Sequence, residues 1–181
     1  MLARRRFMAL GAASAAAWGA FSAPAAAQKA IEARSIAFHN LHTGEKLEAI
    51  YFDAGRYVPD ALAAVNRVLR DFRTGEEHLI DPRLLDLLTA VHGQVGAARP
   101  FEVISGYRSP KTNARLHERS AGVANNSLHM QGMAIDVRVE GVALAHLHHT
   151  ALDLRRGGVG LYPVSNFVHM DVGRVRRWTG V

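Results

Sequence analysis

A histidine and an aspartate in the C-terminal half of the chain have the types and surroundings of metal ligands. They are His129 and Asp136, which belong to the segment Ser127–Asp136. Asp136 stands between the apolar residues Ile135 and Val137, where an ionised carboxylate is costly to bury unless another charge compensates it. A divalent cation would supply that charge, because imidazole nitrogens and carboxylate oxygens are ordinary zinc ligands.

A second histidine of the same kind lies in the segment Phe167–Gly173. Its alternating pattern predicts a strand in which His169 and Asp171 share one face. His169 would complete a set of three ligands with His129 and Asp136, and the fourth zinc position would stay open for water, as hydrolysis requires. Spacing alone leaves open the alternative that these are structural histidines, because most histidines bind no metal.

Arg108 lies in a glycine turn that follows a short apolar strand. A fixed guanidinium there can bind a substrate carboxylate through two hydrogen bonds or stabilise a developing oxyanion. The alternative is a surface turn whose arginine pairs with an acid. The chain has no cysteine, so a zinc site must use histidine and carboxylate, a ligand set more typical of catalytic than of structural zinc.

These segments together resemble the D-Ala-D-Ala metallopeptidase superfamily, which also includes the zinc domain of Hedgehog proteins. The resemblance is greatest for the branch that contains murein endopeptidase K. It rests on Ser105–Ser109, Ser127–Asp136 and Phe167–Asp171, and further on Asn40–Glu45, Asp71–Glu76, Ile80–Pro82 and Gly157–Gly160. It therefore covers essentially the whole chain after residue 27.

The resemblance implies one zinc ion bound by His129, Asp136 and His169, with Arg108 assisting substrate or transition-state binding. It also implies that peptidoglycan is the partner and that peptide bonds in its stem peptides or crosslinks are cleaved during cell-wall remodelling. Two alternatives stay open. One is a non-catalytic zinc domain that binds the cell wall or regulates another hydrolase, and the other is a murein carboxypeptidase.

One position departs from the pattern of the wider superfamily, in which a catalytic glutamate precedes the last zinc histidine by three residues. Asn166 stands at that place here, and an amide cannot act as a general base. Asp171 is the candidate base, because strand alternation puts it beside His169. Its alternative role is to orient His169 through a hydrogen bond, and the sequence leaves both roles open.

The first 27 residues have the pattern of a secretory signal, in which Arg4–Arg6 precede an apolar run and a small-residue cleavage site at Ala27. The order Arg-Arg-x-Phe resembles a twin-arginine signal. The apolar run is shorter than the roughly 20 residues of a spanning helix. We therefore expect export to the periplasm, no stable membrane span after cleavage, and a single domain over residues 28–181. Three arginines of the signal account for half of the formal net charge of +6, which argues against nucleic acid as a partner.

Apolar periodicity predicts an α+β domain, in which a small antiparallel sheet is flanked by about three main helices. The resemblance likewise implies a fold like that of Hedgehog and the DD-peptidases. Main helices are expected over 59–72, 82–95 and 142–154, and a shorter helix over 110–119. Strands are expected over 35–42, 46–52, 101–105, 134–139, 157–162, 167–172 and 175–178, with a loop over 121–132. Structural or surface positions are expected for His39, His42, His146, His148 and His149. His117 follows the arginine turn and is a weak candidate for a position near the site.

Overall fold

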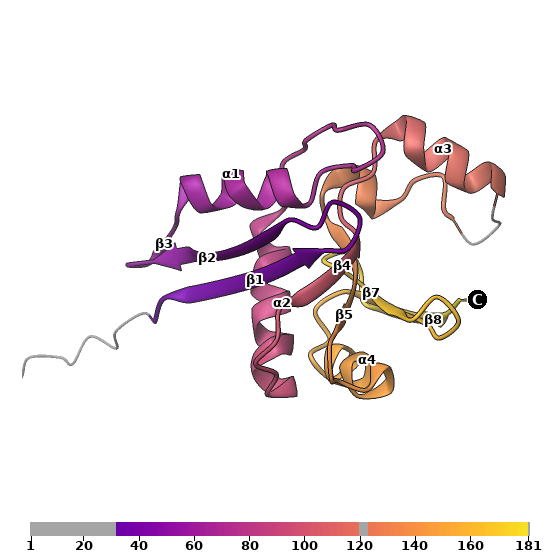
Figure 1. Cartoon of the computed structure of the whole chain (residues 1–181). Coiled ribbons are helices and arrows are strands. Elements are labelled where there is room, and N and C mark those ends of the chain that lie inside the picture. Colours follow the sequence, from indigo (N-terminus) through magenta and orange to yellow (C-terminus); the bar gives the residue numbers. More distant parts are fainter. Residues whose placement is uncertain (1–31, 120–122, 181) are drawn as a thin grey trace, which may run out of the picture. The chain divides into compact units, whose positions relative to one another are not determined.

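The computed structural model describes residues 32–119 and 123–180 (Figure 1). The predicted signal, residues 1–27, lies outside these residues. Within the two described stretches, no helix is long and apolar enough to cross a membrane.

The centre of the domain is one eight-stranded sheet with the order β3-β2-β1-β4-β5-β7-β6-β8. Its strands are β1 (Arg34–Asn40), β2 (Lys46–Asp53), β3 (Arg56–Tyr57), β4 (Phe101–Ser105), β5 (Ala134–Val139), β6 (Gly158–Tyr162), β7 (Phe167–Asp171) and β8 (Arg176–Thr179). The pairs β1–β4 and β6–β8 are parallel, and the other neighbouring pairs are antiparallel.

The prediction of a small antiparallel sheet is therefore wrong in two respects. The sheet has eight strands, and two of its neighbouring pairs are parallel. The long connection from β1 to β4 runs through the hairpin and two helices, which gives the chain enough length to return in the parallel direction. β8 follows β7 in the sequence but pairs with β6, so that it forms the edge of the sheet beyond the β6–β7 hairpin.

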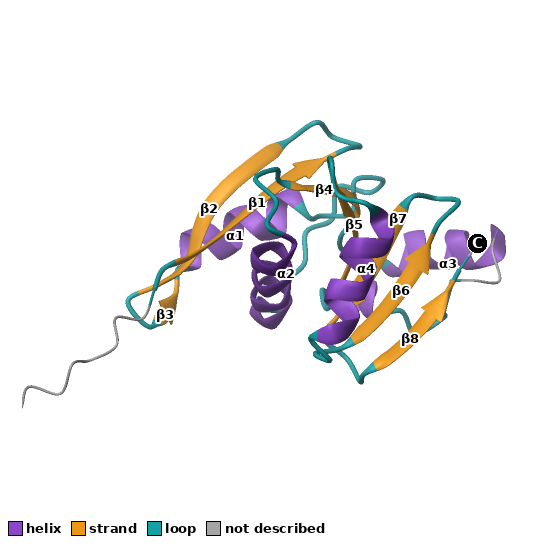
Figure 2. Ribbon diagram, turned by 90° about the horizontal axis from the view of Figure 1, so that it is seen from below, coloured by secondary structure: helices purple, strands orange, loops and turns teal. Residues whose placement is uncertain are grey.

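Four α-helices are present in the described part of the chain, together with the 3-10 helix η1 (Leu128–Gln131). They are α1 (Pro59–Val68), α2 (Pro82–Val95), α3 (Pro110–Arg119) and α4 (Leu144–Asp153). Figure 1 shows α1 and α3 above the strands and α2 and α4 below them, and Figure 2, seen from below, has α2 and α4 in front. The sheet is thus covered by helices on both sides.

The first helix is shorter than expected because a tight turn replaces its last residues. Leu69 caps α1, and the backbone N–H of Gly75 then donates to the carbonyl of Asp71 at 2.7 Å. The second helix agrees with its signals: the Asp81 carboxylate accepts from the N–H of Arg83, and Gly96 ends the helix in a left-handed conformation with φ 64°.

The two faces of the central strands have different roles. Ile135 and Val137 of β5 and Met170 of β7 are fully buried in the apolar core. Because neighbouring side chains on a strand point to opposite faces, Asp136 and His169 lie on the other side of the sheet. The central strands β5 and β7 therefore turn apolar side chains to one face of the sheet and these polar side chains to the other.

Candidate metal centre

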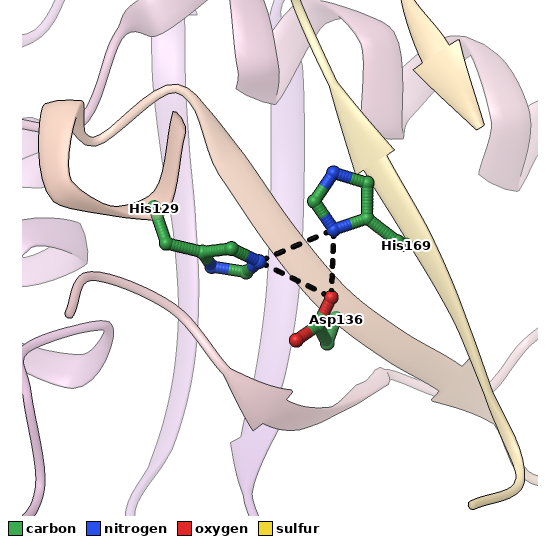
Figure 3. Close-up of side chains that lie close together, drawn as sticks. All are labelled: His129, Asp136 and His169. Atoms are coloured by element: carbon green, nitrogen blue, oxygen red, sulfur yellow. Dashed lines mark hydrogen bonds and ion pairs between the residues drawn. The ribbon is translucent and has the colours of Figure 1, made fainter. Parts of the chain in front are cut away.

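Three ligand atoms converge on the polar face of the sheet (Figure 3). The Asp136 Oδ1 atom lies 3.2 Å from His129 Nε2 and 2.9 Å from His169 Nδ1. The two imidazole nitrogens are 3.2 Å apart. All three side chains are buried, so bulk water has little access to these atoms.

Strand register and a capped 3-10 turn position these side chains. Asp136 and His169 are directly paired across β5 and β7, which places both side chains on one face. His129 lies in η1, and its backbone N–H donates to the Ser127 hydroxyl, which caps this turn. Gly132 ends η1 with φ 66°, and a Cβ atom there would collide with the carbonyl of Leu79. The turn therefore requires glycine for both conformation and space.

The outer nitrogen of each imidazole is held by an acceptor. His129 Nδ1 lies 2.7 Å from the carbonyl oxygen of Gly106, and His169 Nε2 lies 3.0 Å from Asp171 Oδ2. A carbonyl and a carboxylate only accept hydrogen bonds, so both outer nitrogens carry hydrogen. In neutral rings, the lone pairs of His129 Nε2 and His169 Nδ1 then face each other and Asp136 Oδ1. A cation bound between these atoms would remove this repulsion, and the donor set therefore fits a divalent metal ion.

The electrostatics of the metal-free cluster agree with this fit. Burial lowers the pKa of His129 to about 4, which leaves the ring neutral at neutral pH. Burial alone would raise the pKa of Asp136, but His129 and Arg108 outweigh it and hold that pKa well below its usual value. Burial would lower the pKa of His169, yet hydrogen bonds to Asp136 and Asp171 raise it. Metal binding would therefore displace a proton and strengthen as the pH rises.

The predicted site arginine contacts the second oxygen of the aspartate. Arg108 Nη2 donates to Asp136 Oδ2 at 2.5 Å, and Arg108 Nε donates to Ser105 Oγ at 3.0 Å. The backbone N–H of Arg108 donates to the carbonyl of His129 at 3.2 Å. The turn that follows β4 therefore supports two of the three ligands, through Arg108 and through the carbonyl of Gly106.

Asp171 lies on the opposite side of the His169 ring from the cluster, and it is fully buried. Besides His169, it accepts hydrogen bonds from the backbone N–H groups of Gly158 and Gly173 and from the Arg176 guanidinium. Burial alone would raise its pKa, but the hydrogen bonds from His169 and Arg176 outweigh it and hold the pKa well below its usual value. A carboxylate engaged in this way is a poor proton acceptor.

Asn166 occupies the turn before β7 and is exposed. Its φ is 54°, a left-handed conformation that asparagine adopts more readily than most residues. The backbone of this turn thus gives a local reason for asparagine at the place where the superfamily pattern has glutamate.

The remaining candidate histidines lie apart from the three converging ligand atoms. His42 stacks on Phe72 with ring centroids 3.8 Å apart, and His117 Nδ1 lies 2.6 Å from the carbonyl of Val123. His148 and His149 lie next to each other on α4, on the core side of the sheet. These contacts are structural, as the sequence predicts for His42, His148 and His149, and His117 is not part of the ligand cluster.

A buried carboxylate outside the expected site anchors the arginine turn. Asp71 Oδ2 accepts from the backbone N–H and the hydroxyl of Ser109, at 2.9 Å and 2.8 Å, and Asp71 Oδ1 accepts from the N–H of Arg73 at 3.0 Å. Ser109 directly follows Arg108, so Asp71 fixes the start of the segment that carries the guanidinium. The only sequence signal for this role was the segment Asp71–Glu76 within the family resemblance.

Asp71→Asn should lower both stability and activity. Burial alone would raise the pKa of Asp71, but hydrogen bonds from Thr112 and Ser109 lower it. This carboxylate therefore stabilises the fold above about pH 4, its unfolded pKa, and less as the pH falls through its folded pKa. We expect the free energy of unfolding of the variant to be about 1–3 kcal/mol lower than that of the wild type at pH 7. It should also fall less steeply as the pH is lowered.

Urea denaturation between pH 7 and pH 2 measures this effect, with Glu77→Gln, an exposed acid of the same loop, as the matched control. Hydrolysis by Asp71→Asn should fall about ten- to a hundredfold through displacement of Arg108. If this variant has wild-type stability and activity, Asp71 does not fix the segment that carries Arg108.

The mixed sheet and the buried His-Asp-His cluster define an α/β domain with a candidate site for one metal ion. The chain belongs to the peptidoglycan L,D-endopeptidase MepK family, whose sequence pattern matches residues 28–178. It is 43% identical over 178 residues to peptidoglycan L,D-endopeptidase MepK of Escherichia coli (strain K12), covering 97% of this chain and 96% of that protein. It is also 43% identical over 149 residues to the probable peptidoglycan L,D-endopeptidase MepK of Haemophilus influenzae, covering 82% and 80% of the two chains. The predicted family and the predicted enzyme class, a peptidase, are thereby confirmed.

Proposed function

We propose that this chain is a zinc-dependent endopeptidase that cleaves peptide bonds in the stem peptides or crosslinks of peptidoglycan. The observation that carries the proposal is the convergence of His129 Nε2, Asp136 Oδ1 and His169 Nδ1, each backed by its own hydrogen-bond partner. Nitrogen and oxygen ligands without thiolate suit zinc in a catalytic site. The names of both relatives support peptidoglycan as the substrate.

In this proposal, His129, Asp136 and His169 hold one zinc ion. Zinc supplies Lewis acidity towards a carbonyl oxygen and makes water nucleophilic at neutral pH. Asp171 orients His169 and fixes its tautomer, because it engages Nε2 and leaves Nδ1 to face the ligand cluster. We prefer this role of Asp171 to that of a general base, since its oxygens are already engaged by His169, Arg176 and two backbone N–H groups.

Arg108 has two tasks in this proposal. Its Nη2 and Nε atoms are engaged by Asp136 and Ser105, which fixes the plane of the guanidinium. Within residues 32–119 and 123–180, no acceptor is bonded to Nη1, and the side chain stays 13% exposed. Nη1 is thus positioned to donate to the oxyanion or to a substrate carboxylate.

The periplasm is the proposed compartment, because residues 1–27 have the pattern of a secretory signal and the substrate lies outside the cytoplasmic membrane. We also propose the twin-arginine route, on the order Arg-Arg-x-Phe at Arg4–Phe7. Fusion of residues 1–27 to a reporter, with Arg4 and Arg5 replaced by lysine as the matched control, tests both statements. Export by both signals alike would contradict the route.

Incubation of the zinc-loaded protein with purified crosslinked murein tests the function. We expect shorter muropeptides to appear, the reaction to stop with chelator, and zinc to restore it. Release of single C-terminal amino acids would instead indicate a carboxypeptidase. Binding to murein without any product would favour the non-catalytic alternative.

A further inference from the structure

A row of residues crosses the strands of the sheet at the level of the metal cluster. Strand register pairs Ser105 with Asp136, Asp136 with His169, His169 with Gly160, and Gly160 with Trp178. Paired residues on neighbouring strands present their side chains on the same face. The row therefore extends the polar face from β4 to the edge strand β8, and Trp178 is its last member.

The Trp178 indole lies directly beside a proposed metal ligand. Its ring centroid is 5.1 Å from that of His169, with 52° between the planes. Gly160 lies between them, and a Cβ atom at this position would collide with the indole ring. The glycine thus gives the indole the space to lie across β6 towards the cluster.

Two further contacts hold the indole in place while part of its surface stays open. Trp178 Nε1 donates to the Tyr162 hydroxyl at 2.9 Å, and the Arg176 guanidinium lies 5.0 Å from the ring centroid. The side chain is nevertheless only half-buried. A large aromatic ring that is fixed and still partly open at the edge of a site is suited to bind an apolar group.

We propose that Trp178 is a specificity-determining residue, whose ring contacts the aliphatic part of the peptide residue next to the scissile bond. This inference rests on the proposed function. The cluster places the scissile carbonyl near His169, and the indole is the aromatic surface beside that ligand. Polar groups lie on the opposite side of the cluster, where Arg108 contacts Asp136. The substrate would thus lie with an apolar side on β8 and a carbonyl or carboxylate on the arginine turn.

Steady-state kinetics of zinc-loaded variants on a soluble crosslinked muropeptide test this contact. Trp178→Ala should raise KM about tenfold with a smaller change in kcat, because an apolar contact is lost. Trp178→Phe should recover most of the affinity, because it keeps an aromatic face. Arg177→Ala is the matched control, since Arg177 lies on the same strand but pairs with Val159 on the other face. Zinc content should stay at the wild-type level in all three variants.

A binding measurement separates this contact from catalysis. The sequence has two tryptophans, and Trp18 lies in the predicted signal. In the uncleaved chain, Trp18→Phe therefore leaves Trp178 as the single tryptophan. Addition of the muropeptide to this variant under chelator should shift its emission in a saturable manner.

An unchanged KM in Trp178→Ala, or an emission that does not respond, would overturn the inference. Loss of zinc from Trp178→Phe would also overturn it, because the indole would then serve to support His169. If the wild type cleaves nothing while the emission still responds, the proposed function fails and the contact stands. If the wild type cleaves normally and Trp178→Ala has the same KM, the contact alone fails.

Discussion

Replacing His129 or His169 by alanine should remove the metal ion and reduce hydrolysis of murein at least about a thousandfold, since metal catalysis supplies several kcal/mol. Each substitution takes away one of the three converging ligand atoms. It also leaves Asp136 Oδ1 with a single remaining partner in the cluster. Atomic emission spectroscopy of the purified variants measures the zinc content, and muropeptide analysis measures the hydrolysis.

His146→Ala is the matched control for these substitutions, because His146 is exposed on α4 and has no part in the cluster. It should keep the wild-type zinc content and activity. Zinc retained in both ligand variants would contradict the assignment of the ligands. Loss of activity with full zinc content would instead assign the two histidines a role in proton transfer.

Asp171→Asn should weaken zinc binding about ten- to a hundredfold, the usual cost of losing an outer partner of a metal-bound histidine. The amide lacks the negative charge that Arg176 and the His169 N–H group require. The free energy of unfolding should also fall by about 1–3 kcal/mol, because the buried hydrogen bonds of Asp171 are weakened. Competition with a chromophoric chelator measures the affinity, and urea denaturation measures the stability.

The same variant separates the two roles of Asp171. If Asp171 orients His169, excess zinc should restore much of the hydrolysis. If Asp171 is the general base, hydrolysis should stay low even at saturating zinc, and the zinc affinity should be nearly unchanged. Asp153→Asn, which changes an exposed carboxylate at the end of α4, is the matched control and should show neither effect.

Two of the three proposed ligands, Asp136 and His169, could be predicted from the sequence because each interrupts an apolar pattern. Asp136 lies inside an apolar strand, and His169 alternates with core residues, so that local periodicity alone places both on a polar face. The register that pairs these two residues follows from neither segment by itself. The family resemblance indicated that the three residues form one ligand set, and their distances come from the structure.

The partners behind the ligands could not be predicted in the same way. The Gly106 carbonyl carries no side-chain signal, and Asp71 is far from Ser109 in the sequence. Trp178 comes next to His169 only because β8 pairs with β6 in parallel and because Gly160 has no side chain. The parallel pairing of β1 with β4 was missed for the same reason, since local patterns predict strands but do not determine how distant strands pair.

The most direct test of the proposed zinc site is a crystal structure of the zinc-loaded protein with data collected at the zinc absorption edge. We expect one anomalous peak, enclosed by His129 Nε2, Asp136 Oδ1 and His169 Nδ1, that is absent from crystals of the chelator-treated protein. A zinc ion bound elsewhere, or no peak between these three atoms in a protein that cleaves murein, would contradict it.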